Sequence, residues 1–402
     1  MSDSRDLKLL NRLRDNAQLF EDIRSESGSE LARQERLRAT YEADLVVAGV
    51  SLEDCRSRAA SRLPDGDRLW LTAKSLQQAT AWEVALHKAA RFPEGERVTD
   101  LCSGVGVDTA ALLNRGPVTS VDIDEAMLLR AKWNLEAWRN ASRVSSGHEW
   151  TPEQGDVCQL GPAELAGMGL LHVDPDRRVN RDRAAKRLEQ YSPKLEWMQE
   201  AVTSGASGAL KLGPASNFQQ KFPGTEIELI SLHGECREAT VWFGDLAGPH
   251  SFRATSLPTG ETVSGDPLQA WCPIVDGPQE YIFDPDPAIV RSGLLDTIGE
   301  MHSMGRLDGG DEYLTSGGLP ETAFLTSYFV EATLPNNMRK VKNHLRDDPC
   351  RDYEIKCRHV KVDATKVRRS LPVGKGPLKT LFFLRVNGRA RVILARRVTR
   401  GD

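Results

Sequence analysis

Apolar residues recur three and four positions apart through the first part of the chain. Between residues 5 and 62, leucine, phenylalanine, valine and isoleucine follow this spacing, which is the period of helices with one buried face. We expect a further short helix capped by Ser75, and another capped by Thr80 that runs from Ala81 to the break at Pro93. The chain therefore begins with a helical region.

From Arg97 onward, short apolar runs alternate with helical stretches. The runs have the length and composition of buried strands. Predicted strands cover residues 97–104, 117–124, 169–176 and 208–214, and predicted helices cover 107–116, 125–140 and 191–205. Strands that alternate with helices form a doubly wound, mostly parallel sheet. We therefore expect an α/β fold with a Rossmann-like core.

The rest of the sequence no longer alternates strands with helices. Residues 225–234 and 237–248 look like adjacent strands, and residues 249–320 are rich in Gly, Pro, Ser and Asp, with one helix after Phe283-Asp284-Pro285-Asp286-Pro287. In that motif proline would fix the first helical turn and aspartate would complement the helix dipole. Two final strands flank Asn387-Gly388, a strong hairpin signal, and close a small α+β unit. The expected regions are 1–92 (helical), 93–245 (the α/β core), 246–325 (connecting) and 326–402 (basic α+β).

Composition is that of an ordinary globular protein. The 402 residues are 40% hydrophobic and 27% charged, and the N-terminus has no apolar signal core. No apolar run approaches the roughly 20 residues of a membrane helix. Seven cysteines are scattered without a CxxC pair, so the sequence indicates neither a disulfide framework nor a zinc site. We expect a cytoplasmic protein with no metal; the oligomeric state stays open.

Charge is distributed unevenly along the chain. Residues 338–402 carry 19 Lys and Arg against 6 Asp and Glu, whereas the rest carries 34 basic and 51 acidic residues. Phosphate contacts are the usual use of so basic a surface; the alternative is that this face docks on the acidic part of the same molecule. Aromatic residues for base stacking are few (Tyr353, Phe382 and Phe383), which favours recognition of folded RNA through its backbone.

The residues at the end of the first predicted strand give the clearest indication of a ligand-binding site. Asp100 precedes Gly104 and Gly106, and a helix follows at once; such glycines let the backbone turn sharply and approach a ligand. Asp122 ends the second strand, where an acidic residue can reach a ribose diol. The G-x-G-x-x-G motif of dinucleotide-binding sites has a third glycine at the position where this chain has Thr109. A carboxylate at Asp100 also suits a cationic amino group better than a diphosphate, so a nicotinamide-dependent oxidoreductase is disfavoured.

These features resemble class I S-adenosylmethionine-dependent methyltransferases over roughly residues 70–245. The resemblance implies that S-adenosyl-L-methionine is the cofactor and assigns a set of binding residues. Asp100 and the backbone around the glycines would hold the methionine moiety, Asp122 the ribose hydroxyls, and Asp156 the exocyclic amine of adenine. The full set of expected cofactor-binding residues is Asp100, Cys102, Ser103, Gly104, Gly106, Asp122, Ile123, Asp156 and Val157.

A polar cluster follows the predicted strand that ends near residue 173. Asp174-Pro175-Asp176-Arg177-Arg178 resembles the (D/N)-P-P-(F/Y/W) loop of enzymes that methylate exocyclic amines, but Asp176 and Arg177 replace the second proline and the aromatic residue. It is more similar to the DPxRR motif of a bacterial methyltransferase-like group with a C-terminal THUMP-like domain, which implies an RNA connection. The expected catalytic residues are Asp174, Pro175, Arg177 and Arg178.

The roles expected for these residues follow from their chemistry. Asp174 would orient an acceptor or take its proton, and the two arginines would either grip an acceptor phosphate or pair with nearby acids. His172 is expected in the core, and His233-Gly234-Glu235-Cys236 at a strand turn.

The leading hypothesis is a methyltransferase of structured RNA, either tRNA or rRNA. The alternatives are a methyltransferase of a small-molecule or protein acceptor, and a non-catalytic RNA-binding or scaffold protein that keeps the fold.

Overall fold

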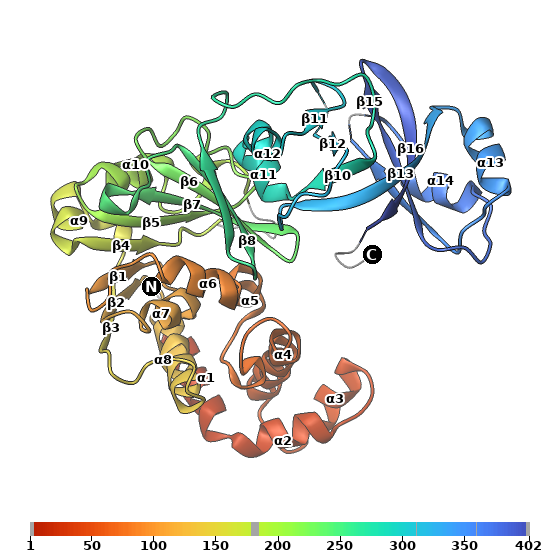
Figure 1. Cartoon of the computed structure of the whole chain (residues 1–402). Coiled ribbons are helices and arrows are strands. Elements are labelled where there is room, and N and C mark those ends of the chain that lie inside the picture. Colours follow the sequence, from red (N-terminus) through yellow and green to blue (C-terminus); the bar gives the residue numbers. More distant parts are fainter. Residues whose placement is uncertain (1–3, 178–184, 311, 359, 399–402) are drawn as a thin grey trace. The chain divides into compact units, whose positions relative to one another are not determined.

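The computed structural model describes residues 4–177, 185–310, 312–358 and 360–398 (Figure 1). The chain divides into two units, which we describe separately. The first unit comprises Met1–Glu226 and Glu238–Gly248, and the second comprises Ile227–Arg237 and Pro249–Asp402. The division into four regions expected from the sequence remains a prediction.

Helices fill the first part of unit one, as the spacing of apolar residues predicts (Figure 1). They are α1 (Ser4–Asp15), α2 (Ala17–Ser25), α3 (Glu30–Leu37), α4 (Ala43–Ala59), α5 (Ala73–Gln78) and α6 (Trp82–Ala89). The apolar faces of α2 and α4 meet in a small core of their own, in which Leu19, Ile23 and Val46 are buried. This core stabilises the helical region by removing apolar surface from water.

The expected caps of α5 and α6 are wrong in detail. Thr72 is the N-cap of α5, and its side chain accepts a hydrogen bond from the backbone N–H of Ser75, which is the third helical residue and bonds back to Thr72. Thr80 does not cap α6, whose N-cap is Ala81 with no side-chain hydrogen bond. The hydroxyl of Thr80 instead points to Asp108.

The sheet of unit one confirms the predicted α/β fold class. Its strands lie in the order β3-β2-β1-β4-β5-β7; the first five are parallel, and β7 runs antiparallel to β5. The strands are β1 (Val98–Leu101), β2 (Val118–Asp122), β3 (Trp150–Gln154), β4 (Leu170–Val173), β5 (Ser207–Leu212) and β7 (Glu235–Phe243). The helices between them are α7 (Val107–Leu112), α8 (Glu125–Asn140), α9 (Pro162–Met168) and α10 (Leu195–Thr203). A doubly wound sheet brings the loops after β1, β2 and β4 to one edge.

Strand β3 was not predicted from the sequence. It has the sequence Trp-Thr-Pro-Glu-Gln and pairs with β2 at the end of the strand order. Three of its residues are exposed and one is proline, so it lacks the apolar run that marks a buried strand. Proline is tolerated there because an edge strand has a free side.

Unit two contains two sets of strands. The first joins β6 (Glu226–Leu232), β8 (Phe252–Leu257) and β9 (Glu261–Gly265). The second is a seven-stranded sheet in the order β11-β12-β10-β13-β16-β15-β14. Its strands are β10 (Tyr281–Pro285), β11 (Gly305–Arg306), β12 (Leu314–Ser316), β13 (Leu325–Pro335), β14 (Tyr353–Cys357), β15 (Lys379–Val386) and β16 (Arg389–Arg397). The helices are α11 (Pro287–Ser292), α12 (Leu295–Met301), α13 (Met338–Arg346) and α14 (Ala364–Ser370).

Several local predictions for unit two are confirmed. Asn387 and Gly388 both have positive φ and form the turn between β15 and β16. Asp286 caps α11, accepting a 2.7 Å hydrogen bond from the backbone N–H of Ala288. His233 and Gly234 form a turn after β6. The described residues of the region 249–320 form two helices and five strands, so the prediction of one helix there is wrong, because short elements separated by turn residues show little periodicity.

Candidate active site

A cavity of about 470 Å³ lies at the carboxyl ends of β1, β2 and β4. Its walls are the loop between β1 and α7, the turn after β2, residues 155–158 after β3, and the segment that follows β4. Residues of α5 and of the link between α5 and α6, together with Met127 of α8, Ser192 and Pro193, complete the lining. Open α/β sheets bind ligands at this edge, and the volume falls in the range of small-molecule sites. The cavity brings together nearly all residues that the sequence singled out.

The loop after β1 turns sharply, as its glycines predict. Cys102, Gly104 and Gly106 have φ angles of +62°, +56° and +84°. A Cβ on Gly106 would lie 3.1 Å from the Cβ of Ala131, whereas one on Gly104 would meet nothing. The hydroxyl of Ser103 is buried, and no described residue forms a hydrogen bond with it. A buried hydroxyl without a partner beside a cavity could be satisfied by a bound polar ligand.

Asp122 is held rigidly at the end of β2. Its Oδ2 accepts a 2.8 Å hydrogen bond from the N–H of Gly104, and its Oδ1 accepts a 2.9 Å bond from the N–H of Asp124. Burial raises the pKa of Asp122. Each carboxylate oxygen keeps a second lone pair, which could accept from a ribose hydroxyl. The neighbouring Ile123 is 55% exposed and lines the cavity, where an apolar side chain could cover adenine.

Asp156 and Val157 line the same cavity. Asp156 caps a short helical turn by accepting a 3.0 Å hydrogen bond from the N–H of Cys158, and Val157 is buried. The N–H of Gly155 donates to the carbonyl of Asp122 at 3.0 Å, which ties this turn to β2. An oriented carboxylate beside an apolar wall fits the edge and face of adenine, so this side of the cavity fits the nucleoside part of S-adenosylmethionine.

Asp100 does not reach the cavity. It is fully buried in β1, with Oδ1 2.7 Å from Nδ1 of His172 and Oδ2 accepting from the hydroxyl of Thr109 at 2.5 Å. The acidic residue after β1 that does line the cavity is Asp108, in the first turn of α7. The expected direct contact between Asp100 and a methionine amino group does not fit this geometry, because the side chain of Asp100 is fully buried and does not line the cavity.

Asp174 faces the cavity from the end of β4. Its N–H donates to the carbonyl of Leu101 at 3.0 Å, and its Oδ2 lies 2.6 Å from Nζ of Lys211 in β5. Burial raises the pKa of Asp174, and the ammonium of Lys211 offsets part of that rise. Pro175 follows it in the lining. A carboxylate in this position could orient an acceptor group or take its proton.

The rest of the motif lies partly in the cavity wall. Asp176 accepts hydrogen bonds from Lys74 at 2.9 Å and from Gln78 at 2.8 Å, both on α5. Arg177 lines the cavity. Arg178 lies outside the described residues. Lys74 and Gln78 were not assigned to the site from the sequence, because nothing in their spacing connects α5 to a strand end.

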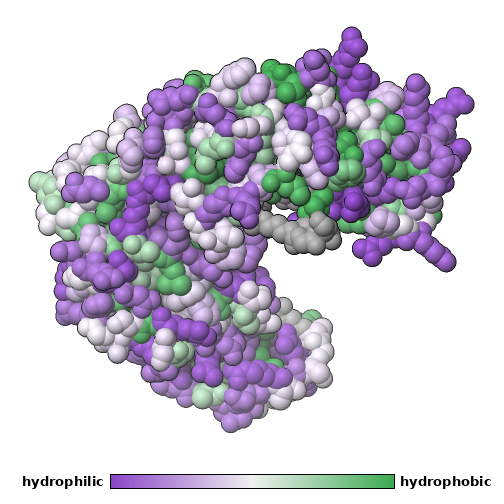
Figure 2. All heavy atoms as spheres, viewed as in Figure 1, coloured by the Kyte–Doolittle hydropathy of each residue, from purple (hydrophilic) through white to green (hydrophobic). Residues whose placement is uncertain are grey.

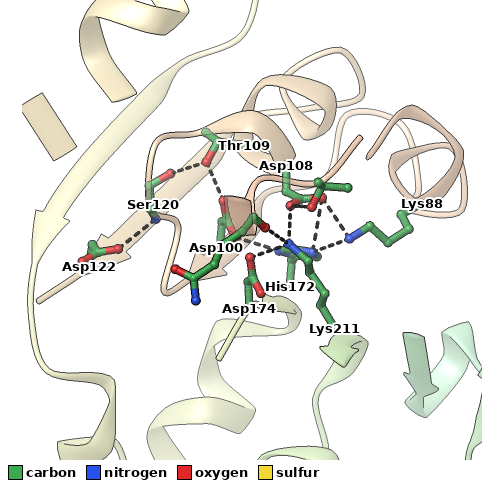
Figure 3. A network of polar contacts seen from close by, with 12 residues as sticks. Lys88, Asp100, Asp108, Thr109, Ser120, Asp122, His172, Asp174 and Lys211 are labelled. Carbon is green, nitrogen blue, oxygen red and sulfur yellow. Dashed lines mark hydrogen bonds and ion pairs between the residues drawn. The ribbon is translucent and has the colours of Figure 1, made fainter. Parts of the chain in front are cut away.

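A buried polar network lies behind Asp174 and Asp108 (Figure 3). Lys88 of α6 lies 2.9 Å from Asp108 and 2.7 Å from Glu238 of β7. Thr80 donates a 2.5 Å hydrogen bond to Asp108, and His172 lies in the same network, in the core as expected. Burial alone would lower the pKa of Lys88, but Asp108 and Glu238 raise it above the ordinary value.

Sequence reasoning did not assign Lys88, Lys211 or Glu238 to the site. Lys88 fits an amphipathic helix and gave no signal. The available signal was a charged residue inside an apolar strand, namely Lys211 in Ala-Leu-Lys-Leu-Gly and Glu238 at the start of Ala-Thr-Val-Trp-Phe. Such residues are rarely buried unless they are paired.

Two further observations concern the described residues alone. Within the ranges given above, His, Cys, Asp and Glu side chains do not form any group of three or more that could hold a metal ion. In the same part of the chain, no helix is both long enough and apolar enough to cross a membrane.

Comparison with known proteins gives the relationships of the chain. Residues 325–397 match the family described as THUMP domain-like. The chain is 32% identical over 341 residues to an S-adenosylmethionine-dependent methyltransferase of Mycobacterium tuberculosis, covering 81% of this chain and 89% of the relative. A shorter stretch of 91 residues is 41% identical to ribosomal RNA small subunit methyltransferase B of Serratia proteamaculans and covers 21% of each chain.

A solved structure extends the likeness to the whole chain. A crystal structure from Porphyromonas gingivalis W83, described as a methyltransferase, superposes with a TM-score of 0.76 over 99% of this chain and all of that one, at 18% identity. At this identity the likeness shows the fold. The mycobacterial relative, by contrast, shows the family: the chain is a member of the S-adenosylmethionine-dependent methyltransferases, and it ends in a THUMP-like domain.

Proposed function

We propose that this methyltransferase acts on structured RNA. The observation that carries the proposal is the coupling, in one chain, of the cofactor cavity with a strongly basic THUMP-like domain. Residues 338–402 carry an excess of 13 positive charges on a chain whose net charge is −4. Basic surfaces of this kind bind nucleic-acid phosphates through release of counterions. The likeness of this chain to a ribosomal RNA methyltransferase over 91 residues agrees with an RNA acceptor.

Helix α13 supplies the best-defined part of the basic surface. Val341 and Leu345 are buried, four residues apart, so one face of the helix packs on the domain. Arg339, Lys340 and Arg346 are exposed. Figure 2 shows hydrophilic residues over most of this part of the visible face. The helix therefore presents positive charge to solvent.

Some of the positive charge serves the interior of unit two. Lys356 and Arg358 of the basic domain pair with Asp284 at 2.7 and 2.8 Å, and Arg358 also pairs with Glu312. These cations bind acidic residues that precede the THUMP-like domain in the chain, as the docking alternative expects. The exposed cations of α13 lie outside these pairs and remain the main candidates for RNA contacts.

The aromatic residues between positions 338 and 402 favour backbone recognition. Tyr353, Phe382 and Phe383 are 2%, 0% and 1% exposed, so none offers a face to a base. Sequence-specific reading of single-stranded RNA relies on such faces. Recognition of a folded RNA through phosphates and shape needs only the exposed cations.

Within the cavity, we assign the adenosine to the side formed by Asp122 and Val157, and the acceptor to the side formed by Asp174. When bound, S-adenosylmethionine supplies a methyl group that is already activated, so the protein mainly positions the acceptor. Asp174 would hold the acceptor and receive its proton, and Arg177 would contact an acceptor phosphate. The remaining proposed cofactor contacts are Cys102, Ser103, Gly104, Gly106, Ile123 and Asp156.

We also place the chain in the bacterial group whose strand-end motif is DPxRR. Support comes from Asp174-Pro175-Asp176-Arg177-Arg178, from Tyr191-Ser192-Pro193 and from Lys211-Leu212-Gly213-Pro214 in that order. Ser192 and Asp176 exchange backbone hydrogen bonds of 2.8 and 3.0 Å, so the first two of these motifs are joined in the structure.

Transfer of a labelled methyl group tests the proposal. The protein is incubated with labelled S-adenosylmethionine and an extract from cells that lack it, and half of each reaction is treated with ribonuclease and half with protease. We expect label that ribonuclease releases, protease leaves, and the Asp174→Asn variant does not incorporate. Label that survives ribonuclease and is lost with protease would overturn the RNA acceptor.

A further inference from the structure

The buried ammonium groups of Lys211 and Lys88 belong to the polar network around Asp174 and Asp108 (Figure 3). Lys211 lies 2.6 Å from Asp174, and its side chain is 5% exposed. Lys88 is 2% exposed and pairs with Asp108 and Glu238. Asp108 joins the two lysines, since Lys211 lies 3.7 Å from its other carboxylate oxygen. Burying two lysines costs free energy, so their place next to the reacting groups calls for a chemical explanation.

The network carries more negative than positive charge. His172 lies between Asp100 and the ammonium of Lys88, with Nδ1 2.7 Å from Asp100 and Nε2 3.4 Å from Lys88. The network therefore holds two lysines and one histidine against four carboxylates, namely Asp100, Asp108, Asp174 and Glu238. The carboxylates outnumber the basic groups whichever form the imidazole takes.

Asp174 is the carboxylate of this network that can exchange a proton with a substrate. Its side chain is 27% exposed and lines the cavity, whereas that of Asp108 is 10% exposed and held by both lysines. Excess buried negative charge favours uptake of a proton. Asp174 is thus placed to act as a base, with the ammonium of Lys211 held next to it.

The ammonium also discriminates between acceptor atoms. Methylation of a neutral amine builds positive charge on nitrogen in the transition state, and a nearby fixed cation opposes that charge. A hydroxyl must lose its proton to become a strong nucleophile, so partial negative charge develops on its oxygen in the transition state. The same cation stabilises that charge until the methyl group neutralises it. Lys211 beside Asp174 therefore favours an oxygen acceptor.

The residues that line the cavity also argue against a nucleobase as the acceptor. None of the described lining residues is Phe, Tyr or Trp, and the sequence of residues 178–184 contains no aromatic residue either. Enzymes that act on a base hold it by stacking on aromatic or apolar faces. After Asp174 the lining continues with Pro175, Asp176 and Arg177, and Lys74 and Gln78 bond to Asp176. The charged and amide groups of this wall suit a sugar and its phosphate.

We propose, on the basis of the RNA function above, that the acceptor is the 2′-hydroxyl of a ribose, with Asp174 as the base and Lys211 as a positioning residue. The acceptor oxygen forms a bond to the methyl carbon as the bond from that carbon to the sulfonium sulfur breaks. The electron pair of the broken bond stays on sulfur, giving S-adenosylhomocysteine, and the hydroxyl proton passes to the carboxylate of Asp174. Lys211 orients that carboxylate and offsets the negative charge on the oxygen.

The product distinguishes this proposal from the proposed function on which it rests. RNA labelled by the wild-type protein is hydrolysed with alkali, which cannot cleave the bond next to a 2′-O-methylated ribose. We expect the label in alkali-resistant dinucleotides. Label in mononucleotides would overturn the hydroxyl acceptor and leave RNA methylation standing, whereas absence of label from RNA would overturn RNA methylation itself.

Variants of Lys211 test its role. Lys211→Met removes the charge and should lower kcat by about 100-fold or more, with affinity for S-adenosylhomocysteine within about twofold of wild type, because Lys211 does not line the cavity. Lys211→Arg keeps a cation and should recover part of the rate. The matched control is Lys221→Met, whose partner Glu189 lies away from the cavity. A wild-type rate in Lys211→Met would overturn the role.

The pH profile separates this role from simple structural support. Burial raises the pKa of Asp174 and Lys211 lowers it, so the acid limb of kcat/KM should move to higher pH in Lys211→Met and stay near the wild-type position in Lys211→Arg. The other titratable or charged groups that face this pair are Lys74, Lys88, Asp100, Cys102, Asp108, His172, Asp176, Arg177 and Glu238. An unshifted limb in Lys211→Met would contradict the assignment.

Discussion

Lys88 and Asp108 form an ion pair of 2.9 Å in a part of unit one where their side chains are 2% and 10% exposed. Glu238 completes the pair from the other side at 2.7 Å. Removing one partner of a buried pair leaves the other charge without compensation. We therefore expect Lys88→Met to lower the free energy of unfolding by about 3–5 kcal/mol, measured by urea denaturation. Asp108 and Glu238 would both lose the ammonium that they share, and Asp108 would keep Lys211 at 3.7 Å.

An exposed ion pair in the same unit provides the control. Arg97 and Glu149 lie 2.8 Å apart, with side chains 46% and 69% exposed. Surface pairs contribute little because water and salt screen them, so Arg97→Met should stay within about 1 kcal/mol of wild type. Equal losses in the two variants would mean that the buried network does not stabilise the fold.

Asp122 gives a prediction for cofactor binding. Two backbone N–H groups orient its carboxylate, and hydrogen bonds to a charged group contribute about 1.5–3 kcal/mol. Asp122→Ala should therefore weaken binding of S-adenosylhomocysteine by roughly 10- to 100-fold, measured by calorimetry. Glu153→Ala, on the neighbouring strand β3 and exposed, should bind normally. Unchanged affinity in Asp122→Ala would remove this residue from the site.

The same residue predicts how cofactor binding depends on pH. Burial raises the pKa of Asp122 above its ordinary value of 3.8, so its carboxylate gains a proton at a higher pH than a free aspartate does. Protonation removes acceptor capacity for ribose hydroxyls, and affinity should fall as pH decreases through this raised pKa. Asp122→Asn should bind more weakly with a flatter profile over that range. A slope that survives in Asp122→Asn would show that Asp122 is not the titrating group.

The parts of the fold that could be predicted from sequence are those with local signals. Parallel strands such as β1 and β4 are short buried runs, and the turn at Gly104 and Gly106 needs positive φ angles that glycine adopts readily. Asp122 was found because it directly follows a buried run at a strand end. These features need only a few neighbouring residues, so a single sequence specifies them.

The parts that could not be predicted depend on interactions between distant segments. Lys88 meets Glu238 across a long stretch of chain, and each residue alone looks like an ordinary surface charge. Asp100 fits the expected motif by position, yet its carboxylate points inward to His172. The packing of β1 against β4 sets this direction. Strand β3 carries no apolar run because it is an edge strand. The pairing of side chains that are far apart in the chain depends on the fold and produces no regular spacing of residues in the sequence.

The exposed cations of α13 give the last prediction. Arg339, Lys340 and Arg346 face solvent, and each cation that neutralises a phosphate of duplex nucleic acid adds about 0.9 to the slope of log K against log salt. Replacing all three with glutamine should weaken RNA binding and lower that slope by about 2–3, measured by filter binding at several salt concentrations. Cofactor affinity should not change, because these residues lie outside the cavity.

A control matched in charge decides whether α13 is specific. Lys8, Arg38 and Lys132 are exposed cations of unit one, and replacing all three with glutamine removes the same charge from the protein. If both triple variants lose RNA affinity equally, the effect is one of net charge and α13 has no particular role. If only the α13 variant loses affinity and slope, the THUMP-like domain holds RNA through this helix, and methyl transfer by that variant should recover at low salt or high RNA concentration.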